Sequence, residues 1–195
     1  MYLFIDTETT GLPPRGVKVT ESNYESWAVC RVVQVAWEVR DAKGTILSMF
    51  NSIVKPQGFL IPNEVVRIHG ISNEIANTTG KPIEDVLQSL MTVIGRYKVT
   101  TVVAHNIVFD DNALTAEMYR AGMKDDVINW RGLHRFCTMK SATRPGERWP
   151  KLAVLYERLC GPLTEAVGSG RLHDASVDVR LCAEVYFKLA PPSSF

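Results

Sequence analysis

The alternation of apolar and polar residues in the first third of the chain predicts three β-strands. The apolar run Tyr2–Ile5 is typical of a first strand. Across Val33–Val39 every second residue is a large apolar one, and a further strand-like run covers Thr45–Val54. The turn-forming residues 41–44 join these two runs, so we expect a β-hairpin. The polar segment before residue 27 shows no period and is expected to be a loop.

Beyond the hairpin, the spacing of apolar residues changes to that of helices. Apolar positions in Ile83–Tyr97 follow a helical period, and Pro82 stands at the start, where a helix tolerates proline. Residues 100–104 are β-branched and apolar without alternation, as expected of a strand buried on both faces. Further helices are expected from about Asp110 to Ala121 and over Ala175–Leu189. This order predicts an α/β fold in which α-helices flank a central mixed β-sheet.

Composition is that of an ordinary globular protein and predicts one domain over residues 1–195. Hydrophobic residues make up 46% of the chain and charged residues 22%, which excludes a disordered or membrane protein. The apolar N-terminus meets Asp6 too soon for a signal peptide or a membrane span. The four cysteines form no CxxC pair, so reduced thiols in a cytoplasmic protein are expected. The net charge of +1 argues against coating of long nucleic acids but allows a pocket for a strand end.

The first candidate for chemistry is the pair of acids at the end of the first strand. Asp6 and Glu8 are two residues apart, so β alternation points both carboxylates to one face and Thr7 to the other. Paired carboxylates require a raised pKa or a neutralising cation, and hard oxygen ligands select Mg²⁺ or Mn²⁺. The alternative is a solvated acidic strand end without a function.

A third acid, Asp110, follows the buried strand at residues 100–104. It is expected at the carboxyl edge of that strand, where α/β folds place their ligands. The alternative role is a helix N-cap, which Asp111 beside it could also fill. The spacing of Asp110 with Leu114 and Met118 places it on the packed face of the expected helix, while Asp111 points further round.

His173 and Asp178 form the last candidate pair. They are five residues apart, so in one continuous helix they would lie on different faces. We therefore expect His173 in the loop before the helix and Asp178 in its second turn. A histidine titrates near neutral pH and suits proton abstraction from water. Taken singly, each residue has an ordinary alternative as a surface, capping or solvated first-turn side chain.

Together these five residues form the set that phosphodiester hydrolysis needs. Such hydrolysis uses acids that hold two metals roughly 3.5–4 Å apart, one to activate water and one to stabilise the leaving oxygen, together with a base. The combination is therefore more specific than any of its members.

Three segments of the chain resemble the DnaQ-like, or DEDDh, family of 3′-to-5′ exonucleases, which includes the proofreading subunit of bacterial DNA polymerase III, the TREX nucleases and RNase T. The segments are Phe4–Leu12, Ala104–Asp110 and His173–Asp178, in the family's order and at similar separations. Residues 68–72 and 149–152 add to the likeness, which spans nearly the whole chain. The resemblance implies an RNase H-like fold and hydrolysis that releases nucleoside 5′-monophosphates from a 3′ end.

The resemblance also implies a role for each residue of the candidate set. Asp6 would bridge two divalent cations, and Glu8 would ligate one of them and contact the terminal 3′-hydroxyl. Asp178 would complete the set of ligands around the metal nearer the nucleophile, and Asp110 would act mainly through metal-bound water. His173 would be the general base.

Substrate contacts are expected next to these acids. By resemblance, Leu12 would wedge beside the terminal base and Asn106 would position the strand, and we place Thr9 with them. For Leu12 the alternative is an ordinary buried loop residue. Two departures from the family pattern leave the catalytic set intact: Gln34 replaces an acid that is common at that strand position, and residues 137–139 are Cys-Thr-Met where many relatives have Asp-Thr-Leu.

The loop over residues 13–27 is longer than in minimal members of the family. It holds Arg15, Lys18, Tyr24 and Trp27, a mixture that could stack and hold single-stranded bases. The alternative is a solvated loop with one tucked aromatic residue. His69 and His105 are expected to be hydrogen-bonded structural residues rather than bases.

Other functions remain in competition with the exonuclease. A catalytically silent nucleic-acid-binding or polymerase-associated module would keep the same fold, although a silent module should have lost one of the clustered acids. A Mg²⁺-dependent hydrolase of nucleotides is a third interpretation. DNA or RNA 3′ ends are the expected partners. Thr9 and Thr10 after Glu8 resemble the proofreading and TREX members more than the oligoribonuclease branch, and this resemblance favours single-stranded DNA. A polymerase partner and a homodimer both stay open, and no membrane partner is expected.

Overall fold

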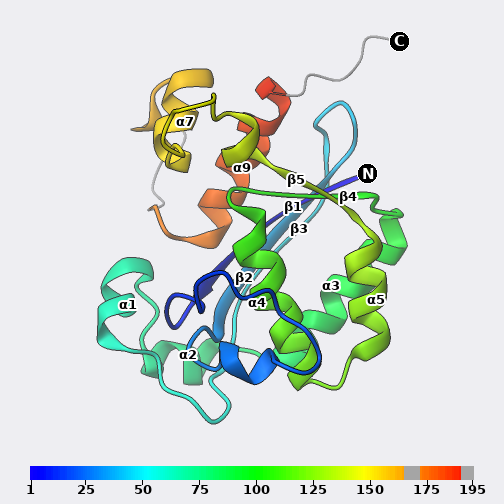
Figure 1. Ribbon diagram of the computed structural model, residues 1–195, viewed down its shortest axis with the longest axis vertical. Coiled ribbons are helices and arrows are strands. Elements are labelled where there is room, and N and C mark those ends of the chain that lie inside the picture. Colours follow the sequence, from blue (N-terminus) through cyan, green and yellow to red (C-terminus); the bar gives the residue numbers. More distant parts are fainter. Residues whose placement is uncertain (165–171, 190–195) are drawn as a thin grey trace.

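A computed structural model describes residues 1–164 and 172–189 of the chain. Its centre is a five-stranded sheet with the strand order β3-β2-β1-β4-β5 (Figure 1). Strand β2 is antiparallel to both β1 and β3, whereas β4 runs parallel to both β1 and β5, so the sheet is mixed as predicted. The strands are β1 (Tyr2–Thr9), β2 (Val32–Arg40), β3 (Ile46–Ile53), β4 (Thr101–Ala104) and β5 (His134–Cys137).

Helices cover both faces of this sheet (Figure 1). On one face lie α3 (Ile83–Tyr97), α4 (Ile107–Arg120) and α5 (Lys124–Gly132), and on the other lies α9 (Ala175–Leu189) with α7 (Leu152–Leu159) packed against it. The short elements are η1 (Tyr24–Trp27), α1 (Asn63–His69), α2 (Asn73–Thr79) and α6 (Thr138–Ser141).

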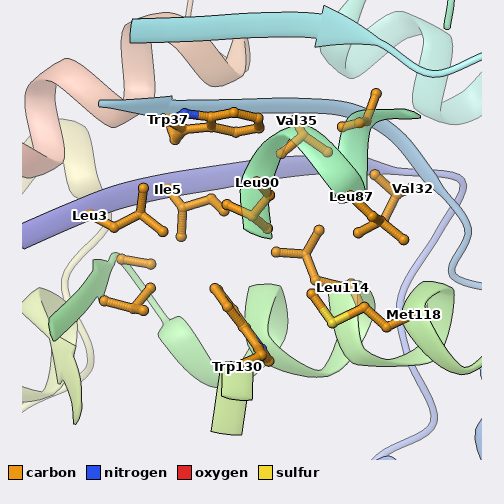
Figure 2. Close-up of a cluster of buried hydrophobic side chains, with 14 of the residues drawn as sticks. Leu3, Ile5, Val32, Val35, Trp37, Leu87, Leu90, Leu114, Met118 and Trp130 are labelled. Atoms are coloured by element: carbon orange, nitrogen blue, oxygen red, sulfur yellow. The ribbon is translucent and has the colours of Figure 1, made fainter. Parts of the chain in front are cut away.

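The main core lies between the sheet and the layer of α3 and α4. Leu3 and Ile5 of β1 point into it and meet Leu90 of α3 and Leu114 of α4, with Trp130 of α5 closing one side (Figure 2). All of these side chains are buried, and burying each one stabilises the fold by roughly 1.5–3 kcal/mol. The apolar positions of the sequence pattern are therefore the residues that pack the helices against the sheet.

A second core on the opposite face determines where the acids of β1 point. Phe4 packs there against Ala175, Val179 and Tyr186 of α9. Because side chains alternate along a strand, Asp6 and Glu8 lie on the same face as Phe4 and thus beside the start of α9. The packing of α9 on the central strand β1 brings residues from the two ends of the sequence together on one face of the sheet.

The predicted strands and the two long helices α3 and α9 are confirmed, with small changes at their ends. Strand β1 continues to Thr9, four residues further than its apolar run indicated. Helix α4 begins at Ile107 rather than near Asp110, because Asn106 takes a left-handed conformation (φ 71°) that turns the chain into the helix early. Asp110 thus lies inside the first turn and is not the N-cap.

All four cysteines lie within the described residues and each is a free thiol, in line with the absence of CxxC pairs. Among the helices of residues 1–164 and 172–189, none combines the length and the apolar character that a membrane crossing requires.

Candidate active site

The carboxyl end of β1 and the start of α9 form a compact group of ligand atoms. One donor atom each from Glu8, His173 and Asp178 lies within 4.8 Å of the other two. Glu8 and Asp178 are partly buried, whereas His173 is exposed. The structure therefore brings together three of the five residues of the predicted catalytic set.

Asp6 lies at the centre of the negative charge. Burial raises the pKa of its carboxyl well above the ordinary value, and the neighbouring charges of Asp110, Asp178 and Glu8 raise it further, in that order. Like charges at short range make ionisation costly unless a cation neutralises them. Asp6 and Asp110 are thus electrostatically part of the site, although they are not members of the compact group of three.

Asp110 reaches this site from the other face of the sheet because β4 is short. The pairing of β4 with β1 stops at Phe4, which leaves the edge of β1 beyond it open. The Oδ1 atom of Asp110 lies at this open edge. It accepts hydrogen bonds from the Thr7 backbone N–H (3.0 Å) and the Thr7 hydroxyl (2.8 Å). Only 2% of Asp110 is exposed, and this burial raises its pKa to about 7 against the lowering effect of the Thr7 hydrogen bonds.

The packed face of α4 is the one predicted from its spacing. Leu114 and Met118 are buried together with Asp110, whereas Asp111 points aside and receives hydrogen bonds from Arg135 (2.8 and 3.2 Å). The choice of Asp110 over Asp111 as the site residue therefore agrees with the position of the two side chains.

His173 stands outside the helix, as expected, and Asp178 stands inside it. His173 has a left-handed backbone (φ 62°), and α9 begins two residues later at Ala175. Asp178 lies in the first turn of α9 rather than the second, since the helix starts only three residues before it. Burial raises the pKa of Asp178 to about 6, while the charge and the backbone N–H of His173 lower it.

Gln34 ties the start of α9 to the sheet. Its Nε2 donates to Asn51 Oδ1 (2.9 Å) and to Asp174 Oδ1 (3.3 Å), and its Oε1 accepts from the Ala175 N–H (3.4 Å). Asp174 Oδ1 also accepts from the N–H and hydroxyl of Ser176 and so caps the helix. Since Gln34 pairs with Glu8 across β1 and β2, it holds the segment with His173 beside Glu8.

The residues expected to contact substrate differ in how accessible they are. Leu12 is 84% exposed, so its side chain is free to meet a ligand and the alternative of a buried loop residue is wrong. Asn106 is partly exposed at the N-terminus of α4. Thr9 is buried, and its hydroxyl donates to the Gly11 carbonyl (2.9 Å), so its role toward a strand stays a prediction.

The long loop uses its aromatic residues for packing. Trp27 is buried in the main core, and the Tyr24 ring stacks on Tyr119 of α4 with 5.8 Å between centroids. These rings are therefore committed to the fold, which agrees with the alternative of a loop that tucks an aromatic residue in rather than with a loop that stacks bases. Arg15 and Lys18 of the same loop are exposed.

His105 and His69 are structural, as predicted. His105 Nδ1 lies 2.9 Å from the Thr138 hydroxyl and Nε2 lies 3.0 Å from the Pro150 carbonyl, and burial lowers its pKa. It thus joins the end of β4 to the segment before α7. His69 is buried, and its Nδ1 accepts the Ile71 N–H (3.1 Å).

The carboxylates and the imidazole near the carboxyl end of β1 are suitable ligands for divalent cations. Burial raises the pKa of Asp6, Asp110 and Asp178, and the neighbouring carboxylates raise that of Asp6 further. A cation is the partner that lets such groups ionise together. Carboxylate oxygens suit Mg²⁺ and Mn²⁺, and the nearby imidazole of His173 provides a group that can accept a proton.

The protein has a mixed sheet between helices and a cluster of acids at the end of strand β1. Comparison with known protein families identifies this fold. The family model described as Exonuclease, RNase_T, matches residues 3–186, so the chain belongs to this exonuclease family and is a nuclease of RNase H-like fold. Among the curated proteins, a search found no match.

Solved structures of exonuclease I share the fold. Escherichia coli exonuclease I in complex with a dA16 oligonucleotide superposes with a TM-score of 0.67 at 20% identity, covering 97% of this chain and 41% of that one. The same enzyme with a 5cy-dT13 oligonucleotide gives 0.69 at 21%, covering 98% and 41%. A product-bound exonuclease I gives 0.66 at 23%, covering 96% and 42%. The chain thus spans about two fifths of the length of these proteins.

Proposed function

We propose that the chain is a 3′-to-5′ exonuclease that hydrolyses the terminal phosphodiester bond of a nucleic acid and releases nucleoside 5′-monophosphates. The observation that carries this proposal is the grouping of Glu8, His173 and Asp178 within 4.8 Å, next to the partly buried Asp6 and the buried Asp110, in a chain of the exonuclease family. We propose residues 1–195 as a single exonuclease domain that acts in the cytoplasm.

The acids are proposed as ligands of two divalent cations, Mg²⁺ or Mn²⁺, held by Asp6, Glu8, Asp110 and Asp178. When bound, these cations supply Lewis-acid activation of water and neutralise charge at the scissile phosphate. The raised pKa of Asp110 and Asp178 supports this assignment, since such groups favour a state in which a cation replaces the proton.

His173 is proposed as the general base. Its exposed imidazole lies beside the Glu8 and Asp178 carboxylates, on a segment outside the helix, so it can reach a water at the edge of the site. It would accept the proton of the attacking water, and the nearby carboxylates would stabilise the resulting imidazolium.

Single-stranded DNA is the proposed substrate, with RNA as the second polymer. The support comes from the oligonucleotide complexes of exonuclease I that share this fold. Leu12, with its exposed side chain, is proposed to lie against the terminal base, and Asn106 and Thr9 to position the strand.

End-labelled DNA and RNA oligonucleotides test the proposal with wild-type protein and with Asp6→Ala, His173→Ala and Asp125→Ala. Asp125 is an exposed acid on α5 and serves as the matched control. Wild type and the control should shorten 3′ ends in Mg²⁺ or Mn²⁺ and leave them intact in EDTA. Asp6→Ala should abolish the reaction and His173→Ala should slow it at least a hundredfold, in the range of about 10²–10⁴ that general bases contribute. Full activity of Asp6→Ala would refute the site.

A further inference from the structure

A cavity of about 630 Å³ lies between the loop at residues 12–18 and the N-terminal half of α4. It borders the proposed site, because Leu12 and Asn106 belong to its lining. Its size falls within the range of about 300–1,000 Å³ that is usual for ligand pockets.

The wall formed by the loop is held in place by contacts at its far end. The Val19 N–H donates to Asn112 Oδ1 of α4 (2.8 Å), and the Val19 carbonyl accepts from Arg131 of α5. Further along the loop, Arg120 donates to the Tyr24 carbonyl (2.9 Å). The cavity is therefore preformed, and a ligand would not have to order the loop on binding.

The lining of the cavity combines an apolar surface with two cations. Val17, Val108 and Phe109 supply apolar and aromatic surface, while Arg15 and Lys18 are exposed on the loop. Within residues 1–164 and 172–189, neither cation forms a salt bridge or a side-chain hydrogen bond.

Apart from the two cations, the one charged group of the lining is already paired. Asp111 receives two hydrogen bonds from Arg135, which neutralises its charge. The cavity thus offers an apolar surface for a flat ring and free positive charge for a phosphate, which is the chemistry that recognises a nucleotide within a single strand.

We propose that this cavity binds the base of an unpaired nucleotide upstream of the 3′-terminal one, with Arg15 and Lys18 on the adjoining phosphates. The proposal rests on the proposed function for the direction of the strand. In the sequence, Leu12 follows Asp6 and Glu8 and precedes the loop residues of the cavity, and its exposed side chain lines the cavity. A strand that places its last base beside Leu12 therefore continues along this loop. A paired base cannot turn its face into the cavity, so the pocket selects unpaired 3′ ends.

Equilibrium binding tests the proposal without relying on hydrolysis. A 5′-fluorescein-labelled single-stranded DNA is titrated in EDTA with wild type, Arg15→Ala/Lys18→Ala, Val17→Trp and Lys43→Ala. Lys43 is an exposed cation in the turn between β2 and β3, at the opposite end of β1 from Glu8, and is the matched control. We expect both cavity variants to raise Kd about tenfold, and the double variant to lower the salt slope of binding by roughly 0.7 for each phosphate that is no longer neutralised.

A set of DNAs with one abasic nucleotide at successive upstream positions locates the base. At one position the missing base should weaken binding to wild type but not to Val17→Trp, which fills the cavity. If no position shows this coupling and both cavity variants bind like Lys43→Ala, the proposal is overturned. Failure of wild type to cleave any 3′ end would overturn the proposed function instead, while the binding differences would still decide the cavity.

Discussion

Thr7 donates two hydrogen bonds, from its backbone N–H and from its hydroxyl, to the same oxygen of Asp110. The two residues are 103 positions apart, and they meet because β4 ends before β1 does. These bonds stabilise the ionised form of a carboxyl whose burial favours the protonated form, and the pKa of Asp110 of about 7 reflects both effects.

Removal of the Thr7 hydroxyl should raise the pKa of Asp110 further. Thr7→Val keeps the β-branched shape of this buried residue but loses one donor, so the acidic limb of the pH profile of kcat/KM should move to higher pH. Thr7→Ser retains the hydroxyl and is the control, with a profile close to that of wild type. Superimposable profiles for Thr7→Val and wild type would show that Asp110 does not titrate in the reaction.

Asp110 also makes the metal-free protein sensitive to pH. Its pKa in the folded state lies above the ordinary value of 3.8, so the folded state binds more protons than the unfolded state between about pH 4 and pH 7. Ionisation of Asp110 therefore lowers the free energy of unfolding as pH rises through this window. Asp110→Asn keeps an Oδ1 acceptor for Thr7 without the charge.

Urea unfolding in EDTA measures this effect as the difference between wild type and Asp110→Asn. The two proteins should be most alike near pH 4, where Asp110 is protonated in both states, and the advantage of the variant should grow as the pH rises to 8. Addition of Mg²⁺ at pH 8 should stabilise wild type more than the variant. A difference that stays constant from pH 5 to pH 8 would contradict the raised pKa.

Gln34 is expected to act through the position of His173 and Asp178. Gln34→Ala removes the bonds to Asp174 and to the Ala175 N–H, which should let the start of α9 shift. Because small displacements of catalytic groups reduce the rate of the chemical step, kcat should fall about tenfold or more while KM changes little. A merely structural role would instead lower the thermal midpoint without this split between kcat and KM.

The charge variant at the same position adds a second readout. In Gln34→Glu a carboxylate oxygen replaces the Nε2 group that donates to Asp174 Oδ1. A hydrogen bond between the two carboxyl groups then forms only while one of them is protonated. The activity of this variant relative to wild type should therefore decline as pH rises. Equal activity of the two proteins across the pH range would argue against the bridge.

The ion pair of Glu117, in the last turn of α4, with Arg31 is expected to contribute to the free energy of unfolding rather than to activity. Glu117 is 1% exposed, and its carboxylate accepts two hydrogen bonds from Arg31 (2.8 and 3.2 Å) and one from the Val32 N–H (3.1 Å). Glu117→Ala leaves the partly buried guanidinium of Arg31 without its carboxylate partner and should cost about 3 kcal/mol, the lower end of the range for a broken buried pair. Glu157→Ala, at an exposed position on α7, should change the free energy of unfolding by less than about 0.5 kcal/mol in urea titrations.

Much of the fold follows from periodicity, and the rest depends on tertiary contacts. The helices α3 and α9 were predictable because their apolar residues recur with a helical period over four turns. The short helices α1 and α2 gave no clear period, since most of their residues are exposed. The early start of α4 depends on the left-handed Asn106, a conformation that residue type permits but does not require.

The candidate site divides in the same way. Alternation along β1 was enough to place Asp6 and Glu8 on one face, and helix geometry was enough to separate His173 from α9. The bonds of Thr7 and the bridge of Gln34 could not be predicted, because they depend on where β4 ends and on how α9 lies against β2. The cavity beside Leu12 likewise arises only when the loop folds onto α4.

The product pattern from a 5′-labelled single-stranded DNA in Mg²⁺, compared for wild type, Asp178→Asn and Asp125→Asn, tests stepwise cleavage by these acids directly. We expect a ladder of labelled fragments that shortens by one nucleotide at a time from the 3′ end, with wild type and Asp125→Asn alike and Asp178→Asn inactive. Immediate release of the label as a mononucleotide, internal cuts, or an unchanged ladder from Asp178→Asn would contradict this expectation.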